Sequence, residues 1–239
     1  MRRKFILIAV MVGWLGCWVV GAETLTAEQI VNRVNANFST IKTAVLDFTI
    51  DYNVHLFGCS GLQRWQGKGF YKYPNKLRLD IKDGPIYFAK GNKIRKLDPD
   101  GQGFIVRFIN ALDFSVGFNP RLLTHNFNLK ILEQTKEKAI IEGIPKPGIL
   151  KNAKKLIFHI NLKNNTLEQF DIIFSEKKLN GSIKIQYQKI NDLMVPVGAY
   201  GKSAIQVVNN FLVGLSINMR GKNYHLNADV PDKVFESGF

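Results

Sequence analysis

Residues that could perform chemistry are few in this chain and lie apart from one another. Four histidines are present, and none has a second histidine, a cysteine or a carboxylate at the spacing of metal ligands: His55, His125, His159 and His225. An isolated histidine in a strand or loop is more often a surface residue than a ligand. The sequence therefore predicts no metal centre.

Other motifs that could support catalysis are incomplete. Asp98-Pro99-Asp100-Gly101 resembles part of a calcium loop, but Gln102 follows the glycine and the distant Glu is missing, so we expect a turn. Cys59 has no activating charge close in sequence, which is typical of an inert thiol. No Gly-x-Ser-x-Gly elbow and no glycine-rich loop before a helix occurs. We predict a protein that is not an enzyme and needs no cofactor.

The N-terminus has the composition of an export signal. A basic start, Met1 to Lys4, precedes an apolar run from Phe5 to Val20, and small residues then favour cleavage before Glu23. Residues 1–22 are thus predicted to be a signal peptide that directs the protein to export. Two alternatives remain open: an uncleaved anchor, although the run is short for a span of roughly 20 residues, and lipidation at Cys17.

Cysteine content and charge describe the predicted mature chain. Without Cys17 only Cys59 remains, so no internal disulfide can form and the core alone must stabilise the domain of residues 23–239. The net charge is +14, or +11 without Arg2, Arg3 and Lys4. Export makes nucleic acid an improbable partner, which leaves transient contact with an anionic membrane surface, or simply a soluble basic surface.

One segment has a clear helical pattern. Thr26 and Gln29 form a capping box, and apolar residues follow at helical spacing, which predicts a helix over about residues 26–40. From residue 104 to 125 the chain is apolar without alternation, and Pro120 is suited to a first helical position. We expect one or two short helices there.

The remainder of the chain alternates with a period of two. Leu46, Phe48, Ile50 and Tyr52 share one strand face, and a hairpin with Pro74-Asn75 at its corner follows. Further strands are predicted at 86–90, 93–97, 129–134, 139–143, 155–162, 169–175, 182–189, 203–208 and 214–219. The predicted fold is mainly β within the α+β class: a single curved antiparallel sheet forming an unclosed β-barrel. The N-terminal helix and the short helical insertion cover it as a lid.

The apolar residues suggest a cavity. The chain has 17 Phe and 7 Tyr, and many fall on the strand face that should turn toward the helices. Two small helices cannot cover so long an apolar face, so we expect a cavity beside it. Gly67 and Gly69, without side chains on this face, are expected to leave room next to Trp65 and Tyr71. For any single residue, a packed core is the alternative.

Several short motifs, in order, resemble one family. Gly67 to Leu79 is similar to the glycine-aromatic-Pro-Asn hairpin of the periplasmic lipoprotein carrier LolA and its relatives. Gly91 to Pro99, Asn119 to Leu123, Leu162 to Phe170 and Tyr224 to Phe235 resemble later segments of the same lipoprotein-sorting group. Each motif is short and degenerate, and the resemblance covers nearly the whole predicted mature chain.

The resemblance implies an unclosed β-barrel whose cavity takes acyl chains of lipoproteins or other lipids. The implied location is the periplasm, and the implied partners are an inner-membrane lipoprotein-release transporter and an outer-membrane acceptor. We expect the lipid-binding wall to comprise Phe48, Ile50, Tyr52, Trp65, Tyr71, Tyr73, Leu77, Leu79 and Ile81. We expect the lid to present Val34, Phe38, Phe118, Leu122 and Leu123.

Two features depart from the carriers. Tyr73 stands where the best-known carriers have an Arg that holds the lid closed, which puts lid control by this residue in doubt. The segment from Lys189 to Phe239 is longer than in the shortest carriers and suggests extra strands that close the barrel edge. The alternative function is an envelope-stress or regulatory sensor that binds a lipid or a protein partner with the same half-barrel.

Overall fold

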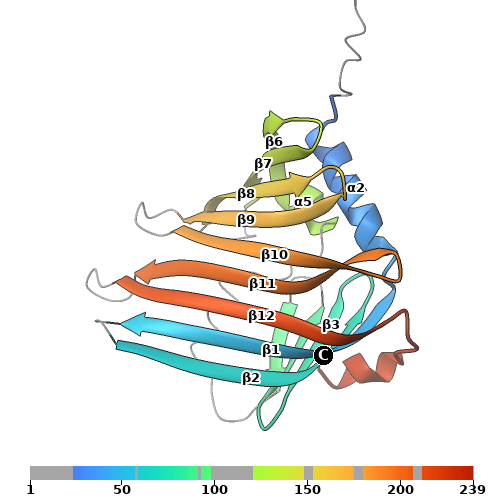
Figure 1. Ribbon diagram of the computed structural model, residues 1–239, viewed down its shortest axis with the longest axis vertical. Coiled ribbons are helices and arrows are strands. Elements are labelled where there is room, and N and C mark those ends of the chain that lie inside the picture. Colours follow the sequence, from blue (N-terminus) through green and yellow to red (C-terminus); the bar gives the residue numbers. More distant parts are fainter. Residues whose placement is uncertain are drawn as a thin grey trace, which may run out of the picture.

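The computed structural model describes residues 24–56, 59–90, 93–97, 121–147, 153–174, 180–206 and 212–238. Twelve strands in this part of the chain form one antiparallel sheet (Figure 1). The strands are β1 Thr43–Leu56, β2 Cys59–Lys72, β3 Lys76–Ile81, β4 Ile86–Lys90, β5 Lys93–Leu97, β6 Phe127–Gln134, β7 Lys138–Pro145, β8 Ala153–Asn161, β9 Thr166–Phe174, β10 Asn180–Ile190, β11 Leu193–Gln206 and β12 Leu212–Leu226. The helices are α2 Ala27–Ser39, α5 Arg121–Asn126 and the 3₁₀ helix η2 Asp232–Gly238.

Helix α2 forms as its sequence predicts. The Thr26 hydroxyl accepts a hydrogen bond from Gln29 N, and the Gln29 side chain accepts one from Thr26 N, which satisfies two of the first free amides. Ile30, Val31 and Val34 are almost completely buried. The apolar stripe of the helix is therefore a packed part of the core.

Most predicted strands are confirmed, and β4 and β5 have the predicted bounds. The clearest difference is β11, which begins at Leu193, ten residues before the predicted strand at 203–208. Pro196, Gly198 and Gly201 break the apolar alternation in this segment. The sheet accommodates them through a register shift opposite Gln186 and Tyr187 of β10. Of the insertion predicted over residues 104–125, α5 is present, while residues 104–120 lie outside the described residues.

The strand order is β5-β4-β3-β2-β1-β12-β11-β10-β9-β8-β7-β6. Within the described residues the two terminal strands, β5 and β6, do not pair, so the curved sheet is not closed. The expectation that the C-terminal strands close the barrel edge is wrong. β11 and β12 instead lie in the centre of the sheet, where β12 pairs with β1 along its length. They provide the ladder hydrogen bonds that join the N-terminal hairpins to the later strands.

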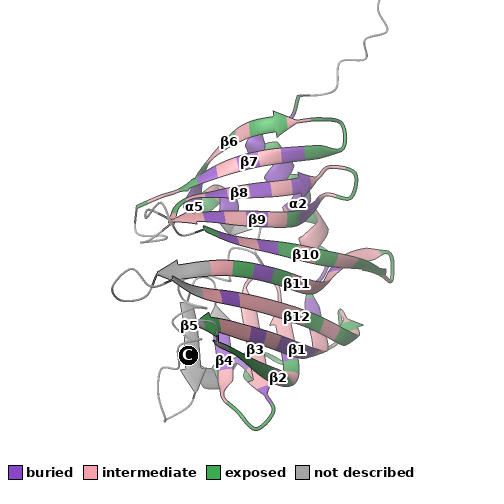
Figure 2. Ribbon diagram, turned by 60° about the vertical axis from the view of Figure 1, so that its left-hand side comes forward, coloured by how far each residue is buried: buried purple, intermediate pink, exposed green. Residues whose placement is uncertain are grey.

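One face of the sheet is apolar across nearly all strands. Cross-strand partners follow one another in a row: Ile141, Phe158, Phe170, Ile183, Gly201, Ile217 and Tyr52. Helix α2 lies on this concave face, behind the sheet in Figure 1, and packs against α5, β6 and β9. The buried segments in Figure 2 gather where β7, β8 and β9 meet these helices.

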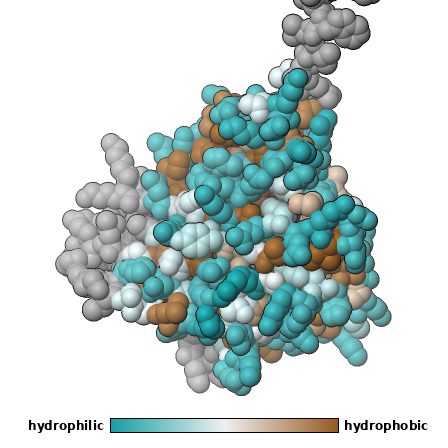
Figure 3. Space-filling view, viewed as in Figure 1, coloured by the Kyte–Doolittle hydropathy of each residue, from teal (hydrophilic) through white to brown (hydrophobic). Residues whose placement is uncertain are grey.

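The opposite, outer face is polar. Figure 3 views the molecule from this side and shows mostly hydrophilic residues over β9 to β12, β1 and β2. Asp51 of β1 accepts hydrogen bonds from Arg64 of β2 and Arg220 of β12, both at 2.6 Å. Alternation along the strands thus separates an apolar concave face from a charged outer face.

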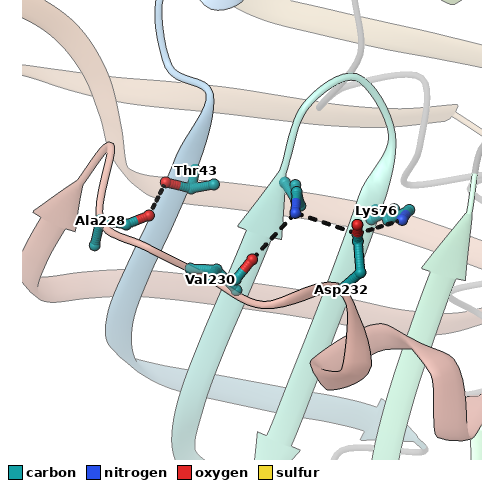
Figure 4. A network of polar contacts seen from close by, with 6 residues as sticks. Thr43, Lys76, Ala228, Val230 and Asp232 are labelled. Atoms are coloured by element: carbon teal, nitrogen blue, oxygen red, sulfur yellow. Dashed lines mark hydrogen bonds and ion pairs between the residues drawn. The ribbon is translucent and has the colours of Figure 1, made fainter.

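The C-terminal segment crosses the outer face of the first strands (Figure 4). The Thr43 hydroxyl donates to the Ala228 carbonyl oxygen at 2.5 Å, and Lys72 Nζ donates to the Val230 carbonyl oxygen at 3.1 Å. Asp232 accepts from Lys76 Nζ at 2.7 Å. Phe235 is buried beyond this network. Helix η2 contacts β3, β4 and β5 and therefore lies against the outer face of these strands.

The glycines of β2 make room for protein side chains and not for a cavity. A Cβ at Gly67 would lie 2.8 Å from Cζ of Phe48 and would also meet the Asp80 carbonyl oxygen. A Cβ at Gly69 would lie 3.3 Å from Cδ2 of Leu46. The expectation that Gly67 and Gly69 leave space beside Trp65 and Tyr71 is therefore wrong, because rings and branches from β1 fill that space.

We expect Gly67→Ala to lower the free energy of unfolding by about 1–3 kcal/mol, because the added methyl overpacks a site bounded by backbone. Gly61→Ala is the matched control in the same strand, since no atom lies within 4 Å of its Cβ position. Urea unfolding followed by circular dichroism measures both. Equal midpoints for the two variants would show that Phe48 and Asp80 can move aside.

Candidate functional site

The predicted wall residues of β1, β2 and β3 meet in one apolar cluster on the concave face. Phe48, Ile50 and Ile81 are buried there with Tyr87, and Trp65 and Leu79 pack against them while still partly exposed. Tyr52 joins through an edge-to-face contact with Trp65, with ring centroids 5.2 Å apart. We call this set, together with Ile217 and Met219 of β12, which pack against the same residues, the β1–β4 cluster.

Trp65 lies in the middle of the β1–β4 cluster. Its ring is stacked on Tyr87 with centroids 6.3 Å apart, and Tyr52 contacts it from another side. The other two tryptophans of the chain, Trp14 and Trp18, belong to the predicted signal peptide. In the predicted mature chain, Trp65 is consequently the single tryptophan and reports on this cluster alone.

Three predicted wall residues lie near the turn that joins β2 to β3. Tyr71 packs in another cluster, with Ile41, Ala44 and Val195, and Leu77 is its cross-strand partner on β3. Burial, together with the nearby Tyr73, raises the pKa of Tyr71 to about 12. Tyr73 follows β2 in the turn, and Lys42 Nζ lies 4.9 Å from the centre of its ring. Tyr71 therefore belongs to a cluster separate from the β1–β4 cluster.

The predicted lid residues lie over the other half of the concave face. Val34 and Leu123 are buried against β7, β8 and β9, and Phe38 contacts Tyr187 of β10 edge to face, with centroids 6.5 Å apart. The side chain of Leu122 and the whole of Phe118 lie outside the described residues. Wall and lid therefore occupy neighbouring parts of one apolar face, joined where Val54 and Leu215 meet Tyr52 and Ile217.

Three residues of the β1–β4 cluster were missed by sequence reasoning: Tyr87, Ile217 and Met219. Leu215, Ile217 and Met219 alternate with polar residues in β12, which is a signal for a strand face. Their proximity to Ile50 and Tyr52 was not visible, because it depends on pairing between strands that are distant in sequence.

The charged groups with perturbed pKa values lie on the outer face and in structural pairs. A hydrogen bond from Arg64, and the charges of Arg64 and Arg220, hold the pKa of the Asp51 carboxyl below its usual range. Burial would raise the pKa of Asp171, but hydrogen bonds from Ser182, His159 and Gln169 lower it overall. Among the described residues, both carboxylates are therefore held in cross-strand pairs on the polar outer face.

Neither a cluster of metal ligands nor a membrane-spanning helix occurs among the described residues. They contain no group of three or more His, Cys, Asp or Glu side chains arranged to hold a metal ion. In the same part of the chain, each helix is too short or too polar to pass through a membrane. His159 has an acidic partner, with Nε2 at 2.8 Å from Oδ2 of Asp171.

Comparison with solved structures identifies the architecture. A LolA superfamily protein from Nitrosomonas europaea superposes with a TM-score of 0.61 at 12% identity, covering 89% of this chain and 98% of that one. The chain has the LolA-like fold. An outer membrane lipoprotein-sorting protein domain from Vibrio parahaemolyticus gives a TM-score of 0.63 at 10% identity, over 89% and 98% of the two chains.

This chain also superposes on a DUF1329 family protein from Desulfovibrio piger, with a TM-score of 0.58 at 10% identity over 89% of this chain and 98% of that chain. No protein-family model and no curated protein matches the sequence. The predicted resemblance is thus confirmed as a likeness of fold, at sequence identities that leave the function to the site itself.

We expect Asp51→Asn to lower the free energy of unfolding at neutral pH by up to about 1 kcal/mol, because the two arginine partners are half exposed and screened by solvent. The pKa of Asp51 is lower in the folded protein than its unfolded value of 3.8. The ionised carboxylate therefore stabilises the fold fully above pH 3.8, and this stabilisation is lost as the pH falls through the pKa of the folded protein. The difference between wild type and Asp51→Asn should therefore shrink below pH 3.8. Urea unfolding at a series of pH values measures it.

Asp192→Asn is the control, because this carboxylate in the β10–β11 turn is 91% exposed. It should change the stability little at any pH. A difference for Asp51→Asn that stays constant down to acidic pH would mean that packing, and not charge, accounts for the effect.

Proposed function

We propose that the protein is an exported, non-enzymatic carrier that holds acyl chains of lipoproteins or other lipids against the concave face of β1–β4. The observation behind the proposal is the β1–β4 cluster. It combines buried Phe48, Ile50 and Ile81 with partly exposed Trp65, Leu79 and Met219 on one continuous apolar surface. A LolA-like fold supports the same function by analogy.

The two halves of the concave face have different roles in this proposal. The stripe of α2, with Ile30, Val31 and Val34 almost fully buried, fills the β6–β10 half. Exposing each of these side chains would cost about 1.5–3 kcal/mol, so α2 is a firmly packed cover. The β1–β4 half offers the side chains that an acyl chain could contact at lower cost, and its predicted wall residues are retained here as the binding residues.

The energetics favour capture that can be reversed. Burying an acyl chain contributes about 0.8 kcal/mol per methylene, or on the order of 12 kcal/mol gross for a chain of about sixteen carbons. Separation of apolar protein surfaces to admit the chain offsets part of this gain. The remaining affinity is small enough for cargo to pass from a releasing transporter in the inner membrane to an acceptor at the outer membrane.

Charge and location complete the proposal. The predicted signal peptide places the carrier in the periplasm, and the net charge of +11 after its removal favours transient contact with anionic lipid headgroups. The polar outer face, with Arg64, Lys68 and Lys222 exposed, can make this contact without using the apolar wall.

Acyl chains bound at the β1–β4 cluster should quench Trp65 when they carry bromine. We expect a peptide with a brominated acyl chain to lower the Trp65 fluorescence of the mature protein. The same acyl peptide without bromine is the control and should lower it less, because it lacks the heavy atom that quenches. Mass spectrometry of protein extracted from a membrane-containing host should also find copurified lipid. No quenching by the brominated peptide, together with no copurified lipid, would overturn the carrier proposal and favour a sensor that binds a protein partner.

The binding face can be tested with a matched pair of variants. Leu79→Asp places a carboxylate in the β1–β4 cluster, and we expect about tenfold weaker acyl-peptide binding or more, because an acyl chain offers the charge no partner. Leu62→Asp is the control on the outer face, where the Leu62 side chain is 65% exposed. Fluorescence titration measures both. Equal loss in the two variants would exclude the concave face as the specific site.

A further inference from the structure

Strands β9 and β10 separate part-way along their length. β10 pairs with β9 only from Asn180 to Lys184, although β10 continues to Ile190 beside β11 and β9 remains paired with β8 as far as Thr166. Figure 1 shows the two strands diverging in front of α2. In the described part of the chain, residues 185–190 thus have no strand partner on the β9 side, and alternate backbone N–H and C=O groups face the split.

A hollow of about 690 Å³ occupies this split. Thr166 and Glu168 line it from β9, and Ile185, Gln186 and Tyr187 line it from β10. The Tyr187 hydroxyl donates to the Leu167 carbonyl oxygen at 3.1 Å and so bridges the two strands.

The Tyr187 ring also closes the hollow from the inside. It contacts Phe38 of α2 edge to face, and its burial raises the pKa of its hydroxyl. Tyr187 therefore separates the hollow from the apolar concave face. The hollow belongs to the outer, polar side of the sheet and is not part of the β1–β4 cluster.

The rim of the hollow is mainly basic. Its charged side chains are Lys138 and Lys184 and the single acid Glu168, which already accepts a hydrogen bond from Asn161 Nδ2 at 2.8 Å. His159 also lines the hollow, but its ring is paired with Asp171. Lys138 lies 3.5 Å from a Glu133 oxygen, in a pair whose side chains are 61% and 48% exposed and whose attraction is weak. Lys184 is exposed and has no ion pair among the described residues.

We propose that the split between β9 and β10 binds an extended, acidic polypeptide segment of a partner protein, which adds as a strand along residues 185–190. The unpaired edge of β10 can supply the main-chain hydrogen bonds, as in other cases of strand addition. Lys138 and Lys184 select acidic side chains by charge. The inference uses the outer face only and stands independently of the carrier proposal.

The choice of a polypeptide over a small anion follows from the edge itself. A free anion would be held by the lysines alone and would leave the backbone groups of β10 unused. Gln186 and Gln188 are exposed while Ile185 and Tyr187 are half-buried. This alternation shows that residues 185–188 keep the extended strand geometry that an added strand needs for pairing. The charges of Lys184 and Lys189 at this edge also disfavour pairing with a second copy of the same strand.

Fluorescence anisotropy with a short labelled peptide of alternating glutamate and valine tests the proposal. The mature protein should bind this peptide, and a peptide with lysine in place of glutamate should bind at least about tenfold more weakly. The same Glu-Val peptide, N-methylated at alternate residues, should lose binding because it lacks the amide donors for the β10 carbonyls. Binding that survives N-methylation, or no binding of the Glu-Val peptide, would overturn strand addition.

Variants locate the site on the protein. Lys184→Glu should weaken peptide binding about tenfold, whereas Lys68→Glu, the same charge change on exposed β2 outside the hollow, should weaken it little. Hydrogen–deuterium exchange should show protection of residues 185–190 when the peptide is bound. Equal effects of the two variants, or protection elsewhere but not in β10, would mean general attraction to a basic surface and would overturn the proposal.

Discussion

The antiparallel pairing of β1 with β12 is the interaction on which the rest of the structure depends. It joins residues 44–55 to residues 214–226 through an almost continuous ladder, so the first and last strands of the sheet in sequence become neighbours at its centre. Without this ladder, the β1–β5 hairpins and the β6–β12 strands would be separate sheets, each with an additional open edge. The concave face is continuous only because these two strands meet.

Packing on the concave face follows from that pairing. Phe48 of β1 lies between Gly67 of β2 and Gly221 of β12, its two cross-strand partners. A side chain at Gly67 would strike the Phe48 ring, so the glycine accommodates an aromatic residue of the neighbouring strand. The same pairing brings Met219 beside Ile50 and Ile217 beside Tyr52, which completes the apolar wall. On the outer face it places Arg220 within reach of Asp51.

Local patterns predicted much of the fold and part of the candidate site. The capping box of α2 and the strands β4 and β5 depend on neighbours in sequence, and each was found where the pattern placed it. Phe48, Ile50, Trp65, Leu79 and Ile81 were correctly assigned to one face, because alternation alone determines which residues share a side. The start of β11 was missed, since Pro196 and two glycines interrupt its alternation and only a register shift against β10 accommodates them.

By itself, the sequence determined most element types and the separation of apolar from polar strand faces. These follow from the period of the side chains and from local capping and turn chemistry. Only the tertiary structure decided that β12 lies beside β1, that α2 covers the β6–β10 half, and that β9 and β10 separate after Lys184. Each of these depends on hydrogen bonds and contacts between residues distant in the chain, and local periodicity contains no information about which distant strands will pair.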